Sequence, residues 1–312
     1  MISRWPSNNT PVRIGTRGSP LALVQANEVQ DRLMAMHGWD SDTFEIVIIR
    51  TTGDRIVDRP LSEIGGKGLF TKEIEDALLK GRIDIAVHSL KDMPTEQPNG
   101  LALDCFLERE DPRDALISRT VSRLEDLTSG DVVGTSSLRR RAQILYRRPE
   151  LTTVEFRGNV QTRLQKLEDG VADCTFLAMA GLNRLKMEHV ATAALDPEEM
   201  LPAIAQGVIA IERRVDDRDA MELLRPIHHF PTDYRVQAER QMLKVLDGSC
   251  QTPIAGLAEL DGDTLRLRGE VLRPDGSECI QHEMSAPYDV APELGEEVGH
   301  ILLEEAGANF FD

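Results

Sequence analysis

The sequence predicts two α/β domains that flank a cleft, followed by a small α+β domain. Three observations support this fold class. Short apolar strands alternate with amphipathic helices over the first two thirds of the chain, a charged and proline-containing stretch interrupts the alternation once, and the last third changes to hairpin-forming strands. At 312 residues, the chain is long enough for two or three domains with cores of their own.

The first alternation opens with a strand at 12–16 and a helix that begins at Ser19-Pro20, since Ser is a good N-cap and Pro suits the first turn. Apolar residues at helical spacing continue this helix to Gly38. A polar loop at 51–67 is longer than an ordinary α/β connection and predicts a functional loop. The other elements expected here are strands at 44–49, 83–87 and 101–106 and a helix at 69–80.

The charged stretch at 108–116 predicts a crossing between domains. After it, the sequence predicts strands at 132–133, 153–156, 175–179 and 208–211 and helices at 138–146, 160–167 and 182–187. In the last third, the DGD and PDGS turn signals predict hairpins and hence a three-stranded antiparallel sheet. Two helices, at 233–246 and 292–306, flank these hairpins.

Charge is unevenly distributed along the chain. The formal net charge is -17, yet residues 134–166 hold eight Lys and Arg residues against two Glu residues. Arginine offers a planar set of donors that matches carboxylate and phosphate groups, so this stretch predicts an anion site. The acidic balance of the whole chain argues against a nucleic-acid partner.

The remaining composition predicts a protein of the reducing cytoplasm. No apolar run reaches the roughly 18 residues that a membrane span needs, and the N-terminus has no apolar core of signal-peptide length. We therefore expect no membrane partner. The four cysteines are far apart and form no CxxC pair, so neither a metal site nor a disulfide framework is expected.

Polar residues follow two strands of the first alternation. Arg17 and Ser19 lie at a helix N-terminus, which favours anions, although an ordinary capped turn explains them as well. Lys91 and Asp92 follow the strand at 83–87. Such a pair can move a proton or stabilise a cation, and it can equally be a solvated pair of loop charges.

The GGKGLF sequence around Lys67 lacks the Walker pattern, because Gly68 follows the lysine and Leu61 occupies the upstream glycine position. A nucleotide site is therefore not expected, whereas a loop that delivers Lys67 to an anion is consistent with the sequence. His88 lies inside the predicted strand and is interpreted as a hydrogen-bonded core histidine before a catalytic one.

Two strand–helix junctions of the second alternation, GTSSLRRRAQ and RGNVQTRL, carry the arginines. Because both combine hydroxyl or amide residues with arginines, together they predict a pocket for several carboxylates. A solvated helix face is the alternative, and Arg157, which precedes Gly158, fits it less well. That alternative suits three arginines: Arg141, Arg147 and Arg148.

Cys250 lies on a short polar loop, LDGSCQTP, at a helix end. A loop thiol is more accessible than a core thiol and its thiolate is a good nucleophile, although an unreactive surface thiol is also consistent. No catalytic histidine is evident near it in the sequence, so a protease-like cysteine is not expected.

Taken in order, the motifs AVHSLKD, GTSSLRR, RGN and GSCQTPI resemble those of the porphobilinogen deaminase (hydroxymethylbilane synthase) family, from about residue 14 to about residue 256. The resemblance implies a transferase of tetrapyrrole and haem biosynthesis, monomeric and cytoplasmic. Such an enzyme deaminates porphobilinogen, joins four units head to tail on a covalent dipyrromethane cofactor, and releases linear hydroxymethylbilane by hydrolysis. Each porphobilinogen carries an acetate and a propionate arm, so the growing chain is a polyanion, which fits the arginine excess.

The resemblance also implies roles for individual residues. Asp92 matches the catalytic aspartate, which also binds the cofactor, and Cys250 matches the cysteine that holds the cofactor through a thioether. The other implied cofactor-binding residues are Lys91, Thr135, Ser136, Ser137, Arg139, Arg140, Arg163 and Arg184. The implied substrate-binding residues are Arg17, Ser19, Lys67, Arg157 and Gln206. Many family members have lysine where this chain has Glu63, so a carboxylate-binding role at that position is in doubt.

The implied fold has three domains, of which the two α/β domains are like those of periplasmic binding proteins. We expect the first at 1–108 and 207–228, the second at 109–206, and the third, with Cys250, at 229–312. The alternative from another functional class is a two-lobed binding protein or effector domain for a small polycarboxylate. That alternative accounts for the arginines but not for Lys91-Asp92 or the thiol loop.

Overall fold

The computed structural model describes residues 4–5, 10–55, 70–248, 252–307 and 310. The chain divides into two compact units. The first unit consists of Met1–Arg59, Glu63–Arg109 and Val208–Asp233, and the second of Pro60–Ser62, Glu110–Gly207 and Tyr234–Asp312. No helix in the described ranges combines the length and the apolar character that a membrane crossing requires.

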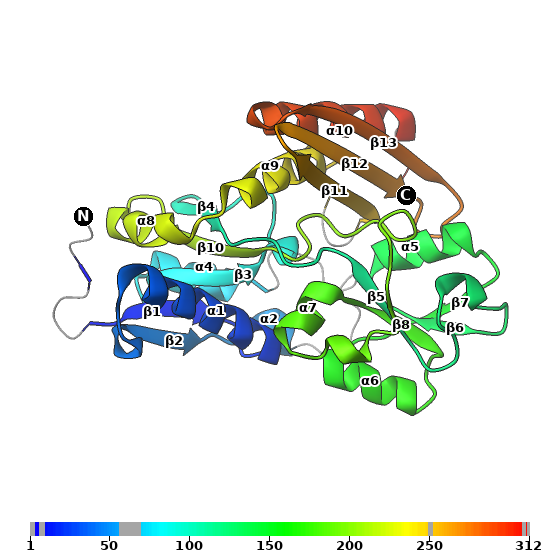
Figure 1. Cartoon of the computed structure of the whole chain (residues 1–312), viewed down its shortest axis with the longest axis horizontal. Helices are drawn as coiled ribbons and strands as arrows, with labels where there is room; N and C mark the ends of the chain where they lie inside the picture. Colours follow the sequence, from blue (N-terminus) through cyan, green and yellow to red (C-terminus); the bar gives the residue numbers. More distant parts are fainter. Residues whose placement is uncertain (1–3, 6–9, 56–69, 249–251, 308–309, 311–312) are drawn as a thin grey trace. The chain divides into compact units, whose positions relative to one another are not determined.

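The first unit contains a five-stranded sheet in the order β2-β1-β3-β10-β4 (Figure 1). β1 is parallel to β2 and β3, whereas β10 is antiparallel to both β3 and β4. The strands are β1 (Val12–Thr16), β2 (Phe44–Ile48), β3 (Ile85–Ser89), β4 (Leu101–Phe106) and β10 (Ile209–Arg214). The expected strands at 12–16 and 101–106 are confirmed, and the strand expected at 208–211 begins one residue later and extends to Arg214.

Capping residues in the sequence mark the ends of the helices of the first unit. In α1 (Pro20–His37), the Ser19 hydroxyl accepts a hydrogen bond from the Ala22 amide at 3.3 Å, and Gly38 ends the helix with φ of 67°. α4 (Lys72–Leu79) ends near Gly81, as expected. The other helices in the described part of this unit are α2 (Thr52–Arg55) within the expected long loop, and α8 (Arg218–Leu224), which was not predicted.

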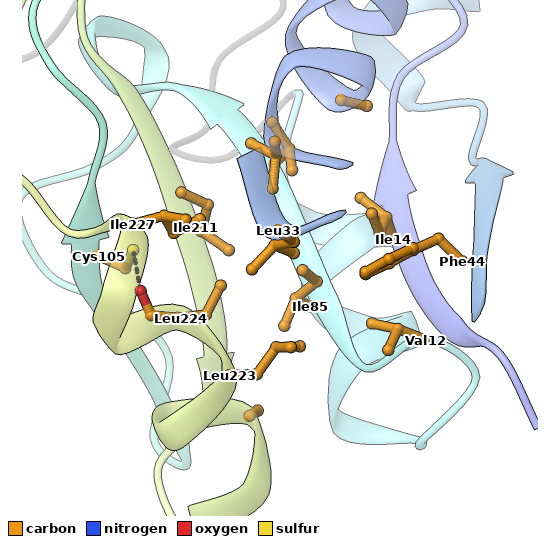
Figure 2. Packing of buried hydrophobic residues seen from close by; sticks show 14 of the residues in the cluster. Val12, Ile14, Leu33, Phe44, Ile85, Cys105, Ile211, Leu223, Leu224 and Ile227 are labelled. Atoms are coloured by element: carbon orange, nitrogen blue, oxygen red, sulfur yellow. Dashed lines mark hydrogen bonds between the residues drawn. The ribbon is translucent and has the colours of Figure 1, made fainter. Parts of the chain in front are cut away.

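Helices cover both faces of this sheet. On one face, Leu33 of α1 and Leu223 of α8 belong to the same buried cluster as Ile14, Ile85 and Ile211 of the sheet (Figure 2). On the other face, α4 contributes a second buried cluster with Ile74, Ala77 and Leu78. Burial on both faces explains why the strands read as apolar runs rather than as alternating patterns.

The second unit contains another five-stranded sheet, in the order β7-β6-β8-β5-β9. Its strands are β5 (Asp114–Ser118), β6 (Val132–Gly134), β7 (Thr152–Val154), β8 (Cys174–Ala178) and β9 (Ala193–Ala194), and its helices are α5 (Leu138–Arg147), α6 (Val160–Glu168) and α7 (Met179–Arg184). β6 is parallel to β7 and β8, and β5 is antiparallel to β8 and β9. β5 begins inside the segment at 108–116, where the sequence predicted a crossing between domains and no strand.

A three-stranded antiparallel sheet, expected from the turn signals, follows in the same unit in the order β11-β12-β13. Its strands are β11 (Ile254–Asp261), β12 (Thr264–Leu272) and β13 (Cys279–Pro287), and the helices beside them in sequence are α9 (Phe230–Val245) and α10 (Ala291–Ala306). Gly295 of α10 packs on α9 so closely that a Cβ atom there would lie 2.2 Å from the Ala238 carbonyl oxygen. These three sheets confirm the predicted fold class.

Six short 3-10 helices complete the described secondary structure. They are η1 (Ser41–Thr43), η2 (Leu90–Asp92), η3 (Leu124–Asp126), η4 (Glu188–Val190), η5 (Arg225–Ile227) and η6 (Tyr288–Val290).

A fully buried carboxylate lies at the start of β5. The Asp114 oxygens accept hydrogen bonds from the Nη2 atoms of Arg139 and Arg140, each at 2.7 Å, and from the Gln206 side-chain amide at 2.8 Å. Burial alone opposes ionisation, but the attraction of the two guanidinium groups outweighs it and holds the pKa of Asp114 well below its usual value. The carboxylate is therefore charged and joins β5, α5 and the segment before β10.

We predict that Asp114→Asn destabilises the second unit strongly, because it leaves two buried guanidinium groups without a counter-charge. Breaking a buried ion pair in this way costs about 3–5 kcal/mol. The urea midpoint at neutral pH, followed by circular dichroism, measures the loss. The matched control is Asp169→Asn at the exposed end of α6, which should change stability by no more than about 0.5 kcal/mol.

The stability difference between the wild type and Asp114→Asn is expected to depend on pH. Because the native pKa of Asp114 is depressed, its stabilising contribution is complete above the unfolded-state pKa of about 3.9 and disappears only as the pH falls through the lower native value. The difference between wild type and Asp114→Asn should thus be constant above about pH 5 and shrink on acidification. Equal effects of the Asp114 and Asp169 substitutions would contradict this account.

Candidate active site

The hydroxyl residues after β6 build the junction with α5. The Ser137 hydroxyl caps α5 by accepting from the Arg140 amide at 3.4 Å, and the Ser136 hydroxyl accepts from the Phe156 amide at 2.9 Å. The Thr135 hydroxyl accepts from the Ser137 amide at 3.2 Å. Each hydroxyl oxygen accepts a hydrogen bond from a backbone amide. These three bonds stabilise the β6–α5 turn and fix the positions of the arginines that follow it.

Arg139 and Arg140 are almost fully buried, at 5% and 6% exposure. Besides Asp114, their Nη1 atoms donate to the carbonyl oxygens of Leu201 and Phe176, each at 2.7 Å. Both Nε atoms are buried and have no hydrogen-bond partner in the described part of the chain. Each guanidinium group is thus anchored in the protein but retains an unused donor.

Arg163 lies in a positive environment. Its Nε atom donates to the Gly158 carbonyl at 2.9 Å, and Gly158 has a φ of 128°, where a Cβ atom would lie 2.6 Å from Thr162. Burial, together with repulsion from Arg140 and Arg157, lowers the pKa of Arg163 to about 10. We call Arg140, Arg157 and Arg163 the arginine group. A negatively charged ligand beside it would relieve this repulsion.

Two further predicted residues, Gln206 and Arg184, make hydrogen bonds near the start of β10. Gln206 lies on the segment that precedes β10, and Arg184 contacts that segment. Gln206 is 1% exposed, and its side-chain amide donates to the Pro112 carbonyl at 2.7 Å as well as to Asp114. Arg184, at the end of α7, donates to the Gly207 carbonyl at 3.0 Å. Both contacts fix the turn that leads from this unit into β10.

The first unit has a pocket at the ends of β1 and β3. Three of the predicted residues line it: Arg17, Ser19 and Asp92. The Arg17 guanidinium lies 4.2 Å from the centroid of the Phe70 ring, which also lines the pocket. Because parallel strands β1 and β3 end at the same edge, residues that are distant in sequence meet here.

Two polar residues that line the pocket are hydrogen-bonded to each other. The Gln25 side-chain amide of α1 donates to the Ser89 hydroxyl of β3 at 2.8 Å. Asp92 ends η2 and is exposed, whereas its neighbour Lys91 is half-buried. The pocket therefore presents a cationic side, from Arg17, and an anionic side, from Asp92.

The solvated-face interpretation is wrong for Arg148 and incomplete for Arg147, which is half-buried and whose Nη2 atom donates to the Glu198 carbonyl at 3.2 Å. Arg148 was expected on a solvated helix face, but its Nη1 atom donates to the carbonyl oxygens of Leu124 and Glu125, each at 3.2 Å. Its Nη2 atom donates to the Leu127 carbonyl, and Nε donates to Glu150 at 2.7 Å. A helix-end arginine can reach back to cap the carbonyls of an adjacent turn, and this geometry is invisible in a periodicity pattern.

Other expected residues fall outside the described part of the chain, namely Glu63, Lys67 and Cys250. The three described cysteines are free. Burial raises the pKa of Cys174 and of Cys279 to about 12, and it raises that of Cys105 still further. These three thiols are therefore poor nucleophiles.

Two acidic residues of the site regions, Asp114 and Glu212, were not predicted from the sequence. Asp114 lies in the charged segment read as a crossing, and Glu212 lies inside the apolar run of β10. The sequence did contain a signal for both residues, namely a single acid at the edge of, or within, a buried strand. Such an acid indicates a buried partner, because a buried carboxylate needs a charged or hydrogen-bonding group beside it. No cluster of metal-ligating side chains occurs among the residues that the structure describes.

Comparison with solved structures finds distant likenesses. A TRAP periplasmic solute binding protein from Desulfovibrio salexigens is 12% identical, with a TM-score of 0.43 over 73% of this chain and 75% of that chain. A periplasmic substrate-binding protein of an ABC transporter from Coxiella burnetii is 15% identical, with a TM-score of 0.41 over 71% of this chain and 93% of that one. At these TM-scores, neither likeness bears on function.

Comparison with families and curated sequences is far more specific. Residues 12–222 match the family model "Porphobilinogen deaminase, dipyromethane cofactor binding domain", and residues 234–304 match the model of the porphobilinogen deaminase C-terminal domain. The chain is 62% identical to porphobilinogen deaminase from Paracoccus denitrificans, over 100% of this chain and 99% of the relative. It is 54% identical to the chloroplastic enzyme from Oryza sativa subsp. japonica, over 96% of this chain and 86% of the relative. On this evidence the chain belongs to the porphobilinogen deaminase family.

Proposed function

We propose that the arginine group and the pocket of the first unit bind the cofactor and the substrate of a hydroxymethylbilane synthase. Family membership supplies the reaction: porphobilinogen is deaminated and four units are joined head to tail into hydroxymethylbilane, with a dipyrromethane cofactor, in tetrapyrrole biosynthesis. This membership decides against the alternative of a binding protein for a small polycarboxylate.

The gathering of Arg140, Arg157 and Arg163 is the observation that carries the assignment of residues, and the lowered pKa of the half-buried Arg163 guanidinium agrees with it. Burial next to two other arginines is unfavourable unless an anion completes the site. The substrate and the cofactor both consist of pyrroles with acetate and propionate arms, so their carboxylates provide that charge. The unused Nε donors of Arg139 and Arg140 support the same conclusion.

We infer that the cofactor is held by one covalent bond and by the residues that match the family's cofactor-binding positions. When bound, the dipyrromethane supplies the pyrrole end to which the first substrate unit is joined. Cys250 is proposed as the thioether position, and the raised pKa values of Cys105, Cys174 and Cys279 favour the remaining cysteine. The other proposed cofactor-binding residues are Lys91, Asp92, Thr135, Ser136, Ser137, Arg139, Arg140, Arg163 and Arg184.

The pocket of the first unit is proposed to take the reacting pyrrole. Arg17 and Ser19 would hold a carboxylate arm at the α1 N-terminus, where amide donors also favour anions. Asp92 would stabilise positive charge that develops on a pyrrole nitrogen and would move its proton. Lys67 and Arg157 are proposed as further substrate-binding residues, and Gln206 is proposed to act through Asp114, to which its amide is bound.

We also propose the three-domain division given above, with a monomeric enzyme in the cytoplasm. The free state of the three described cysteines supports a reducing compartment. The net charge of -17 supports the absence of a nucleic-acid partner.

Intact mass under denaturing conditions tests the cofactor assignment. The protein should be heavier than its sequence by two porphobilinogen units less two ammonia molecules, and Cys250→Ala should remove both the excess and nearly all turnover. Peptide mapping locates the excess. Its appearance on a peptide with Cys105, Cys174 or Cys279 would contradict the assignment.

The arginine group yields a prediction with a control on the adjacent helix. Arg163→Leu should weaken cofactor loading or substrate affinity by about ten- to a hundredfold, since a charged hydrogen-bond partner contributes about 1.5–3 kcal/mol. Arg141→Leu, at an exposed position of α5, should have little effect. The loaded fraction by mass and the KM for porphobilinogen measure both, and similar losses in the two variants would refute the role of the arginine group.

Asp92→Asn should leave fold and bound cofactor largely intact while it slows the chemical step by a factor on the order of 100 or more. Asn has nearly the same shape but cannot carry negative charge or relay a proton. Asp92→Glu keeps the charge and should retain more activity. Single-turnover ammonia release by loaded protein measures the step, and near-normal release from Asp92→Asn would exclude the proposed role.

A further inference from the structure

A buried group of one histidine and two acids lies beside the pocket of the first unit. His88 of β3 is 6% exposed and lines the pocket, and its Nε2 atom lies 3.2 Å from Glu212 Oε2. Glu212 of β10 is fully buried, and Glu75 of α4 is 8% exposed. The strand register pairs His88 with Ala210, so Glu212 is two residues further along the neighbouring strand and faces the same side of the sheet.

The contact with Glu212 determines which nitrogen of His88 carries the proton. With Glu212 ionised, its carboxylate can only accept a hydrogen bond, so a neutral His88 at this distance would donate from Nε2 and keep the lone pair on Nδ1. Among the described residues, no partner of Nδ1 occurs. Since the ring lines the pocket, Nδ1 is the nitrogen available to a ligand there.

Glu75 is the second acid of this group. Burial raises the pKa of Glu75, and the charge of Glu212 raises it further. Glu75 therefore keeps its proton to a higher pH than an exposed glutamate does, which avoids two adjacent buried charges. The second oxygen of Glu212 is buried without a hydrogen-bond partner in the described residues, so His88 is the main described polar contact of this carboxylate.

We propose that His88, positioned by Glu212, is a second proton acceptor in the pocket and takes the carbon-bound proton lost by the pyrrole that is being extended. This inference rests on the proposed function, because the pocket must receive the reacting ring. Asp92 and His88 line the same pocket, so one can balance charge on a pyrrole nitrogen while the other removes the proton.

The step balances as follows. The C–N bond of the substrate aminomethyl group breaks, and its electron pair leaves with ammonia. The ring carbon of the acceptor pyrrole supplies the pair for the new C–C bond, its C–H bond then returns a pair to the ring, and the proton goes to Nδ1. The imidazolium passes that proton to ammonia or water, so the substrate ammonium group departs in sum as ammonium.

Among the residues that the structure describes, four charged or titratable groups contact His88, interact with it electrostatically or line the same pocket. They are Glu212 from β10, Glu75 from α4, Asp92 from η2 and Arg17 from the β1–α1 junction. Replacement of Glu212 by Gln removes the charge that fixes the tautomer, whereas replacement of Glu75 by Gln retains it. The first change should therefore affect His88 more than the second.

The first experiment is nitrogen NMR of the cofactor-loaded protein with ¹⁵N-histidine, with His88 assigned by the signal lost in His88→Gln. Neutral His88 should show a protonated Nε2 and an unprotonated Nδ1, and Glu212→Gln should mix the two tautomers. The matched control is Asp233→Asn, since His228 Nε2 and Asp233 Oδ2 are also 3.2 Å apart but neither lines the pocket. An Nδ1-protonated ring, or an unchanged ring in Glu212→Gln, would overturn the proposal.

The second experiment is the pH profile of single-turnover ammonia and product formation by protein whose loaded mass is verified. In wild type, the acid limb should coincide with the NMR titration of His88. His88→Gln should lower the rate roughly ten- to a hundredfold and abolish that limb, as expected for loss of a proton acceptor. Glu212→Gln should displace the limb, and Asp233→Asn should leave it unchanged.

The two experiments separate this inference from the proposed function. A slow Asp92→Asn with an unaltered pH profile in His88→Gln would reject the role of His88 alone. A normal Asp92→Asn together with unchanged cofactor loading in Arg163→Leu would reject the proposed site, whatever the tautomer of His88. If Glu212→Gln fails to fold, two wild-type measurements still test the role of His88. They are the tautomer of His88 and the agreement between the NMR titration of His88 and the acid limb of the pH profile.

Discussion

The buried carboxylate of Asp114 is the constraint on which the arginine-rich end of the second unit depends. Two arginines in the first turn of α5 oppose the helix dipole and lose hydration when buried. Asp114 offsets both costs from the start of β5, and Gln206 completes its coordination. Glu239 of α9 in turn accepts from the amides of Ala205 and Ala258, at 2.6 and 2.8 Å, and so ties the segment with Gln206 to β11.

The pocket of the first unit follows from a different constraint, the direction of its strands. β1 and β3 are parallel neighbours, so Arg17 and Ser19 after one and Asp92 after the other meet at one edge of the sheet. The antiparallel β10 then places Glu212 behind His88. A parallel strand at that position would have needed a crossover connection and would have ended at the same edge.

The sequence predicted most elements of the fold because their signals are local. Ser19, Pro20 and Gly38 mark the ends of α1 by capping chemistry, and the DGD turn marks the β11–β12 hairpin. The β5 strand was missed because it follows a charged, proline-containing run, and its first residue is an aspartate whose partners lie on α5. The roles of Asp114, Glu212 and Arg148 depend on contacts between distant segments, which periodicity and motif spacing do not encode. The motif residues were found by resemblance, whereas their internal partners required coordinates.

The position of β10 has a consequence for synthesis of the protein. β10 lies between β3 and β4 in the sheet, yet the whole of Glu110–Gly207 is made before it. Until Arg214 has left the ribosome, β3 and β4 each present an unpaired edge, which is a template for pairing with other chains. The usual N-terminal-first order of folding is therefore reversed here: the second sheet can form early, while the first waits for a late strand. A chain that stalls within the intervening segment would thus be an aggregation-prone species and a substrate for chaperones.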